Sequence, residues 1–255
     1  GGTGGIAGAG GSGAIAGAGG TAGSAGSAGS AGSAGSAGSS GPNPIGYWPF
    51  EENTGTTVGD EAGTPPRDGS FAAGKISWTT GGKFGNALVF ADDSAGLSMP
   101  GWWGASFPPV GTVSFWVKTD LQSMEDKHRN FFDRWEPAPA RNHIFLRREG
   151  MDDGFPMLLK IGLQSDANSS SLVNGGHDLD NKVWRHVAVA WDSVAHTCAF
   201  YTSHGVSDGE YSSEPFGTKT GGSSWSPSGQ EFVFGRSLVG TIDEVSLFDE
   251  ALGFV

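Results

Sequence analysis

The chain of 255 residues contains a single cysteine, Cys198, so no disulfide can form within it. Cys198 lies in an apolar run, which predicts a buried and inert thiol. Long hydrophobic runs are also missing, and none approaches the roughly 20 residues that a membrane-spanning helix needs. Lys and Arg number only 15 against 27 Asp and Glu, which gives a formal net charge of −12. This acidic balance argues against a nucleic acid or an anionic membrane surface as the partner.

Residues 1–41 lack every charged residue type and consist almost wholly of Gly, Ala, Ser and Thr. Ala-Gly-Ser triplets run from Ala22 to Ser39. Glycine at every third position suggests collagen, but the proline that a triple helix needs is missing, and the run is short for a silk-like stack. So little apolar surface cannot offset the entropy of ordering. We therefore expect a disordered tether that spans on the order of 35 Å.

The remaining residues, 42–255, hold every charged side chain, every tryptophan and nearly all of the large apolar residues. About 210 residues are enough for one large core and fit a single β-sandwich domain. We expect a low-complexity disordered linker at 1–41 and one globular domain at 42–255. The chain begins with Gly1 rather than Met. This suggests a mature product or a fragment, and a removed export signal would suit a tether followed by a module.

Short strand patterns separated by Gly, Asn, Asp and Pro dominate residues 42–255, and no segment has the period of an amphipathic helix. After a turn-rich stretch at Glu51–Gly82, the expected strands are Ala87–Phe90, Leu97–Met99, Thr112–Val117, Asn130–Arg134, His143–Arg147, Met157–Leu163, Trp184–Trp191, Thr197–Thr202, Glu231–Gly235 and Thr241–Phe248. A further strand is expected at Gly46–Phe50. Many short strands without a helix predict an all-β antiparallel sandwich or barrel.

Strict alternation of side chains assigns two faces to each of two strands. The first strand has Val113, Phe115 and Val117 on one face, with Ser114 and Trp116 on the other. The second has one face made of Trp184, His186, Ala188 and Ala190, and another made of Arg185, Val187, Val189 and Trp191. Because both faces of the second strand carry apolar residues, we expect it to be central, in a two-layer fold with one sheet partly roofed by loops.

Five blocks of sequence follow one another at Tyr47–Phe71, Phe84–Phe90, Trp184–Tyr201, Phe234–Arg236 and Gly240–Leu252. In this order, over essentially residues 45–252, they resemble the laminin-G-like group of the concanavalin A-like lectin/glucanase superfamily. The resemblance implies a jelly roll, that is, a β-sandwich of two antiparallel sheets, one of them curved. It also implies a secreted or cell-surface protein of a bacterium.

The chain departs from this pattern at two places and at its end. The family commonly has an Asp-Gly turn where this sequence has His204-Gly205, so a carboxylate is missing there. The segment Thr119–Met157 is longer than in a minimal member, and we expect it to form a loop over one sheet. The chain also stops at Val255, where the family often continues, which suggests a truncated last element.

The resemblance implies a structural calcium site near the meeting point of the first and last strands, with Asp60, Asp68 and Asp243 as its acidic positions. Ca²⁺ requires six to eight hard oxygen ligands, which carboxylates can supply in part. The alternative is that Asp60 and Asp68 form Asx-type turns beside Gly63 and Gly69, while Asp243 accepts backbone hydrogen bonds. A zinc site is less favoured, because the six His show no close paired spacing and only one Cys is present.

The pair Asp243-Glu244 in the last strand is the candidate for acid/base catalysis. Retaining glycosidases of this superfamily use two carboxylates about 5–5.5 Å apart, which on a strand requires an even spacing. Regular alternation separates Asp243 and Glu244 onto opposite faces. The Glu-x-Asp-x-x-Glu arrangement of laminarinase-like enzymes and the Gly-x-Ser-x-Gly of nucleophile elbows are both absent. The sequence therefore favours a protein that is not an enzyme.

Aromatic side chains outside the strand patterns are the candidates for stacking on sugar rings. They are Trp102, Trp103, Trp135 and Trp225. The alternative for each is a role in capping the ends of the core. The tryptophans within strand patterns are expected in the core: Trp48, Trp116, Trp184 and Trp191.

These patterns favour a non-catalytic extracellular binding module that recognises carbohydrate. Laminin-G-like domains bind proteins as well as glycans, so a protein-binding adhesion or scaffolding module is the main alternative, and a glycoside hydrolase-like enzyme a less favoured one. The expected partner is a glycan or a cell-surface protein. The tether favours display at the cell surface, because a flexible linker raises local concentration without fixing geometry.

Overall fold

The computed structural model describes residues 42–91, 95–99, 110–120, 128–135, 143–148, 159–165, 169–174, 179, 182–192, 197–202, 216–220 and 231–253. They lie within Pro42–Val255, which forms one compact unit. All regular structure in these ranges is strand, and they contain no helix long and apolar enough to cross a membrane. The tether predicted at 1–41 lies outside the described residues and stays a prediction.

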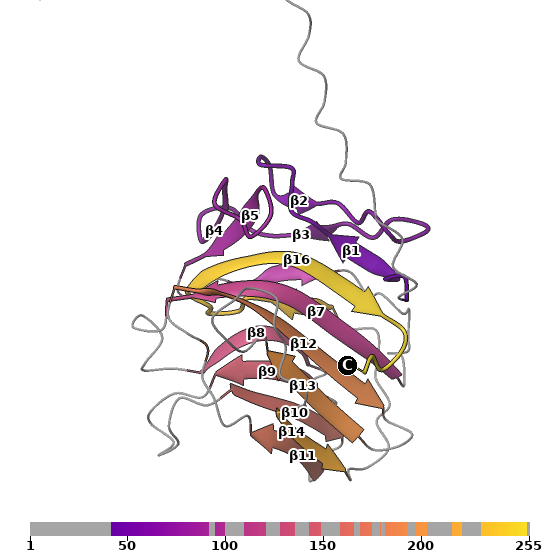
Figure 1. Ribbon diagram of the computed structural model, residues 1–255. Coiled ribbons are helices and arrows are strands. Elements are labelled where there is room, and N and C mark those ends of the chain that lie inside the picture. Colours follow the sequence, from indigo (N-terminus) through magenta and orange to yellow (C-terminus); the bar gives the residue numbers. More distant parts are fainter. Residues whose placement is uncertain are drawn as a thin grey trace, which may run out of the picture. The chain divides into compact units, whose positions relative to one another are not determined.

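The strands form two antiparallel sheets, here called sheet A and sheet B (Figure 1). In spatial order sheet A contains β14 (Phe216–Thr220), β13 (Thr197–Thr202), β12 (Trp184–Asp192), β7 (Val110–Thr119), β16 (Gly240–Phe248), β5 (Ala87–Phe90) and β4 (Ile76–Thr79), with β1 (Gly46–Trp48) also paired to β16. Sheet B contains β11 (Ser169–Asn174), β10 (Leu159–Ser165), β9 (His143–Arg148), β8 (Arg129–Trp135), β15 (Phe232–Phe234), β6 (Leu97–Met99), β3 (Gly69–Ser70) and β2 (Thr57–Val58). The all-β antiparallel jelly-roll sandwich expected from the sequence is confirmed.

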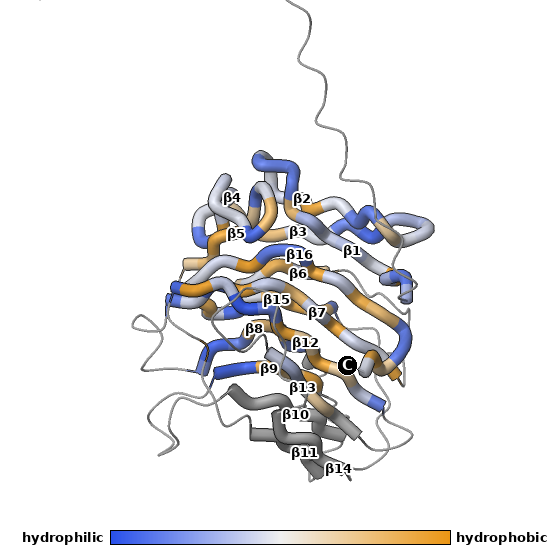
Figure 2. Tube along the Cα trace, viewed as in Figure 1, coloured by the Kyte–Doolittle hydropathy of each residue, from blue (hydrophilic) through white to orange (hydrophobic). Residues whose placement is uncertain are grey.

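The core lies between the two sheets and takes one face of each strand. Val113, Phe115 and Val117 of β7 are buried in it, as the alternation predicts. Phe115 bridges the sheets, because its ring meets Phe132 of β8 at 6.2 Å and Phe234 of β15 at 6.0 Å, both nearly perpendicular. Apolar positions run along β7, β12 and β16 and are interrupted by polar ones (Figure 2).

One edge of β16 is shared by two short strands. Residues Gly240–Ile242 pair with β5, and Val245 and Leu247 pair with β1 further along. The other edge of β16 pairs with β7 along nearly its whole length. Residues 243 and 244 therefore lie at the junction where β5 ends and β1 begins. The side chains of Asp243 and Glu244 therefore lie next to both β5 and β1.

The strand expectations are confirmed wherever the structure describes the residues, but the structure contains additional strands. Three of them, β2, β3 and β4, lie inside the stretch expected to consist of turns. β2 and β3 have two residues each, which is too short for an alternating pattern. The serine-rich β11 has weak strand propensity and forms by pairing with β10 at six positions.

Candidate functional site

The outer face of sheet A, turned away from the core, carries aromatic and polar side chains in register across three strands. His186 of β12 pairs with Trp116 of β7, and Trp116 pairs with Asp243 of β16. In the next row Trp184 pairs with Lys118. Because directly paired residues project to the same face, each row forms a continuous strip of side chains. The face assignments made from the alternation of β7 and β12 are thus confirmed.

Trp116 is the centre of a group that we call the Trp116 cluster, made of Lys83, Phe84, Trp116 and His186. The Lys83 ammonium lies 4.3 Å from the Trp116 ring centroid. Phe84 stands nearly perpendicular to Trp116, with centroids 6.1 Å apart and an angle of 83°. The His186 ring is 5.1 Å away on the neighbouring strand. The cluster combines aromatic surface with a cation and an imidazole in one place.

Phe84 is the most exposed large apolar side chain among the described residues. It is 54% exposed, and only Val183 at 40% is comparable in that part of the chain. A half-exposed phenylalanine beside a half-buried tryptophan leaves apolar surface open to a ligand. Further along the same face, the Lys118 ammonium lies 4.8 Å from the Trp184 ring centroid. The cation-on-tryptophan arrangement therefore occurs twice on this face.

Asp243 holds the loop that presents Phe84. Its Oδ2 accepts hydrogen bonds from the backbone N–H groups of Lys83, at 2.7 Å, and Phe84, at 3.0 Å. The side chain is fully buried, and its Oδ1 has no hydrogen-bond partner among the described residues. Burial raises the pKa of Asp243 to about 7, with a further contribution from the charge of Glu244, while hydrogen bonds from backbone N–H groups act in the opposite direction.

A second carboxylate fixes the other end of this loop. Glu51 accepts a hydrogen bond from the backbone N–H of Asn86, at 3.1 Å to Oε2, and the Asn86 side chain donates to the Glu51 carbonyl. Within the loop, Gly82 N–H donates to the Gly85 carbonyl at 3.1 Å. The loop is therefore fixed by Asp243, by Glu51 and by its own internal hydrogen bond. These bonds fix the backbone at Phe84, and the ring of Phe84 also contacts Trp116.

The structure corrects the sequence interpretation of the pair Asp243-Glu244. Ile242 and Val245 are three residues apart, yet both lie in the core. The register with β7 shifts between Asp243 and Ser246, and Glu244 has a left-handed backbone with φ of 56°. This β-bulge inserts one extra residue, so both carboxylates project from the outer face. The prediction that they lie on opposite faces is wrong, because it assumed a regular strand.

Glu244 ties the bulge to β1. The Tyr47 hydroxyl donates a short hydrogen bond to Glu244 Oε2. Burial, followed by this bond, raises the pKa of Tyr47 above its ordinary value. Burial also raises the pKa of Glu244, and the Tyr47 bond partly counteracts it. The two adjacent carboxylates thus hold two different elements, the β4–β5 loop and β1, against the same strand.

Burial sets the protonation states of the groups at this face. Burial lowers the pKa of His186 to about 4, so its imidazole is neutral at pH 7 and can both donate and accept a hydrogen bond. Asp243 has no exposed surface, so it cannot touch a substrate. Glu244 is bound to Tyr47. What the face offers to a ligand is aromatic surface, ammonium donors and a neutral imidazole.

The aspartates proposed as calcium ligands are used differently. Asp60 Oδ1 accepts hydrogen bonds from Tyr47, Ala62 and Gly63 N–H at 2.9–3.1 Å, and Oδ2 accepts one from Arg67 N–H at 3.1 Å. Most acceptor positions of this carboxylate are thus taken by backbone N–H groups of its own loop and of β1.

Asp68 Oδ1 accepts from the backbone N–H of Asp60 at 3.1 Å. Within the described part of the chain, no three Asp, Glu, His or Cys side chains gather in a way that could hold a metal ion. Asp60, Asp68 and Asp243 therefore do not fit a common calcium site, and the expected Ca²⁺ gains no support from these residues.

The tryptophans predicted as sugar-stacking residues fall mostly outside the described residues. This applies to Trp102, Trp103 and Trp225. Trp135 ends β8, where its backbone pairs with His143, and its side chain is not described. The prediction for these four residues stays a prediction.

The tryptophans expected in the core divide into two pairs. Trp48 and Trp191 are core residues, each 1% exposed. The core prediction is wrong for Trp116 and Trp184, which are half-buried on the outer face. The alternation of β7 contained the signal, because it placed Trp116 opposite Val113 and Phe115. A position in a strand does not imply a position in the core, because only one face of a sandwich strand is covered by the other sheet.

Comparison with known proteins agrees with the architecture. The sequence profile of the family described as the concanavalin A-like lectin/glucanases superfamily (Laminin_G_3) matches residues 104–253. No curated protein sequence matches the chain.

Among solved structures, domain 4 of AbnA, a GH43 extracellular arabinanase from Geobacillus stearothermophilus in complex with arabinotriose, is similar with a TM-score of 0.58 and 18% identity, over 82% of this chain and 94% of that one. The binding domain of botulinum neurotoxin serotype G gives a TM-score of 0.55 at 10% identity, over 82% of this chain and 48% of that one. A Trypanosoma rangeli sialidase gives 0.51 at 12% identity, over 81% and 30%. At these identities the structural likeness concerns the fold, whereas the sequence profile covers more than half of the chain. On that profile match, the chain belongs to the concanavalin A-like lectin/glucanase superfamily.

Proposed function

We propose that this protein is a non-catalytic extracellular binding module that recognises carbohydrate through the outer face of sheet A. The observation that carries the proposal is the Trp116 cluster, in which a half-exposed Phe84 and a half-buried Trp116 stand beside polar groups. Sugar rings present apolar C–H faces and a rim of hydroxyls. A site for them combines aromatic planes with a few fixed donors and acceptors.

The polar groups of the cluster suit hydroxyl recognition. The Lys83 ammonium sits in the angle between the two rings, 4.3 Å from the Trp116 centroid and 5.8 Å from that of Phe84. One of its three N–H donors can face a ring while another meets a ligand oxygen. The neutral His186 ring lies beside Trp116 on β12, with centroids 5.1 Å apart, and adds a polar edge to the cluster.

The relatives support this proposal at the level of the fold. The arabinanase domain with a similar fold was solved with arabinotriose bound. A ligand on the outer face of sheet A can bind without disturbing the packing between the two sheets. A tether ahead of the domain would allow such a module to reach ligands at a cell surface.

The test is a glycan array that includes arabino-oligosaccharides, followed by calorimetric titration of the strongest ligand. Phe84→Ala and Trp116→Ala should each weaken binding about tenfold or more, corresponding to about 1.4 kcal/mol. Val183→Ala is the matched control, because it also truncates an exposed apolar side chain. A ligand bound equally by all three variants would place the site elsewhere. If no glycan binds, an interaction with a cell-surface protein becomes the better explanation of the exposed face.

A further inference from the structure

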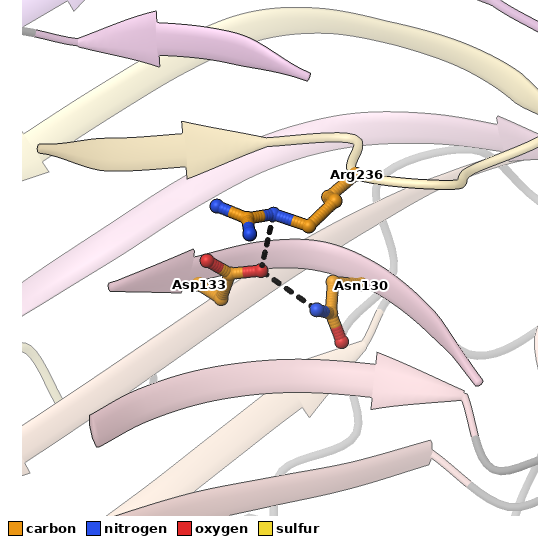
Figure 3. A network of polar contacts seen from close by, with 3 residues as sticks. All are labelled: Asn130, Asp133 and Arg236. Carbon is orange, nitrogen blue, oxygen red and sulfur yellow. Dashed lines mark hydrogen bonds and ion pairs between the residues drawn. The ribbon is translucent and has the colours of Figure 1, made fainter. Parts of the chain in front are cut away.

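A buried polar network on the outer face of sheet B holds an arginine at the surface. Asp133 of β8 is almost fully buried, and its Oδ2 accepts a hydrogen bond from Asn130 Nδ2 at 2.6 Å. The same oxygen lies 3.3 Å from Nε of Arg236, whose side chain is 46% exposed (Figure 3). Asn130 thus fixes the carboxylate, and the carboxylate fixes the guanidinium.

The turn that carries Arg236 is fixed independently by its backbone. Asn130 N–H donates to the Arg236 carbonyl at 3.2 Å, and Arg129 Nη1 donates to the Ser237 carbonyl at 2.7 Å. Gly235 and Ser237, on either side of Arg236, both have a left-handed backbone, with φ of 71° and 57°. A non-glycine residue in this conformation costs free energy and persists only where its surroundings impose it. Arg236 is therefore presented by a rigid turn.

Within the described part of the chain, the ion pair with Asp133 engages only the Nε atom of the Arg236 guanidinium. Between the three residues drawn in Figure 3, the marked contact of Arg236 runs through Nε only. Among the described residues, no acceptor takes a hydrogen bond from its two terminal Nη groups. The strongest pairing between a guanidinium and a carboxylate is bidentate, with two parallel N–H···O hydrogen bonds. Asp133 does not form this pairing with Arg236, and the two Nη groups face no acceptor among the described residues.

We propose that Arg236 is the anion-binding residue of a second site, on the outer face of sheet B, that takes the carboxylate of an acidic sugar such as a uronic acid. A carboxylate matches the planar pair of Nη groups and can accept two parallel hydrogen bonds. Asp133 and Asn130 are positioning residues, because they act through Arg236. This site is on the opposite sheet from the Trp116 cluster and does not depend on it.

The neighbourhood of the network encloses the carboxylate and supplies a second cation. Phe145 and Val233 pair with Asp133 from the two adjacent strands and are only 5% and 9% exposed, so they shield the carboxylate from water. The Arg147 guanidinium lies 4.7 Å from the Phe145 ring centroid, and Arg147 pairs with the neighbouring Asn130. The positive charge of the two arginines is therefore what this neighbourhood offers to an acidic sugar.

The experiment compares trigalacturonic acid with its methyl ester, which has the same sugar rings but no negative charge, by calorimetric titration into the full chain. Wild type should bind the acid at least tenfold more tightly than the ester, a difference of about 1.4 kcal/mol. Arg236→Gln should abolish this preference, and Arg236→Lys should lose most of it, because lysine keeps the charge but not the fork. Lys182→Gln is the matched control, since it removes one positive charge from another exposed ion pair, that with Asp120.

The outcomes separate this site from the proposed function. Retention of the preference in Trp116→Ala and Lys182→Gln, with loss in Arg236→Gln, supports the Arg236 site. Equal affinity of wild type for acid and ester, or an Arg236→Gln variant that keeps the preference, overturns it, as does the absence of any binding to the acid. Asp133→Asn, checked for folding by thermal unfolding, should lower the preference without changing the binding of neutral glycans.

Discussion

At the scale of single residues, several acidic side chains in the described part of the domain accept hydrogen bonds from backbone N–H groups. Asp60 holds its own loop, Asp68 holds Asp60, and Asp243 holds the β4–β5 loop across 159 residues of sequence. A buried carboxylate with good donors can replace a short piece of sheet where the backbone is irregular. Each of these three aspartates, singled out in the sequence as an acidic position, thus anchors a loop through backbone hydrogen bonds.

The stability of the domain should depend on the charge of Asp243. Its pKa is raised from 3.8 to about 7 in the folded state, so the folded protein binds a proton more tightly than the unfolded chain between these values. The stabilising contribution of the protonated form is complete below about pH 4 and is lost as the pH rises to about 7. Each unit by which the pKa is raised corresponds to about 1.4 kcal/mol.

Asp243→Asn, which keeps an acceptor and removes the charge, should therefore gain stability relative to wild type as the pH rises from 4 to 7. The measurement is urea unfolding of both proteins at several pH values. The comparison with wild type is needed because His186 acts in the opposite sense. Its folded pKa of about 4 makes stability rise between pH 4 and 6.5. A difference between the two proteins that is independent of pH would contradict the raised pKa of Asp243.

The role of Asp60 predicts how a calcium test should turn out. In Asp60→Asn an amide N–H replaces one acceptor oxygen, so at least one backbone donor loses its partner, at a cost of about 1–3 kcal/mol. The loss should be the same in EDTA and in millimolar CaCl2, as measured by thermal unfolding. A loss seen only with calcium present would restore the calcium hypothesis.

The outer-face residues show what the sequence could and could not reveal about the site. Alternation in β7 and β12 placed Trp116, Trp184 and His186 correctly on one face of their strands. It could not reveal that Phe84, from a loop, joins Trp116, since that contact depends on long-range hydrogen bonds to Asp243. Sequence reasoning favours loop tryptophans as ligand-binding residues, because loops carry function in many folds.

At the scale of elements, the β-bulge in β16 is the feature that organises the site. Glu244 has a φ of 56°, which costs about 1–2 kcal/mol for a residue with a Cβ and nothing for glycine. In a Tyr47→Phe background, which removes the hydrogen bond to Glu244, the variant Glu244→Gly should be about 1 kcal/mol more stable than Glu244→Ala. Chemical unfolding of the two double variants provides the measurement. Equal stability, or a more stable alanine variant, would mean that the backbone at residue 244 is not left-handed.

The close approach of β7 and β12 gives a second prediction for an element. A Cβ added at Gly111 would lie 2.3 Å from Cζ2 of Trp191, a core residue that is fully enclosed. Gly111→Ala should therefore destabilise the domain by about 1–3 kcal/mol, because the ring has no room to move. Gly253→Ala, where a Cβ would meet nothing within 4 Å, serves as the control. A Gly111→Ala variant as stable as the control would show that Trp191 does not pack on β7.

The elements themselves were largely predictable, and their irregularities were not. Strands such as Trp184–Asp192 and Gly240–Phe248 carry long apolar alternation, which fixes their existence and their faces. The bulge in the second of them is set by its tertiary position, between β5 and β1 on one edge. Nothing in the local sequence marks Glu244 as an extra residue, so the expected faces were right for one half of the strand only.

At the scale of the whole molecule, the two outer faces of the sandwich have different chemistry. Sheet A presents aromatic rings with ammonium groups over them, and sheet B presents a guanidinium held by a buried acid. In this sandwich each sheet packs against the other with its inner face, so binding residues can differ on the outer faces without changing the core. The two proposed sites thus lie on opposite sheets and differ in the charge of the ligand that each would take.

The central claim, that ligand binds on the outer face of sheet A, is tested most directly by following the tryptophan indole N–H resonances in a titration with the strongest ligand of the glycan array. The resonances of Trp116 and Trp184 should shift in proportion to saturation. Those of Trp48 and Trp191, enclosed in the core, should stay in place. Saturable binding that leaves the Trp116 and Trp184 resonances unmoved would contradict the account.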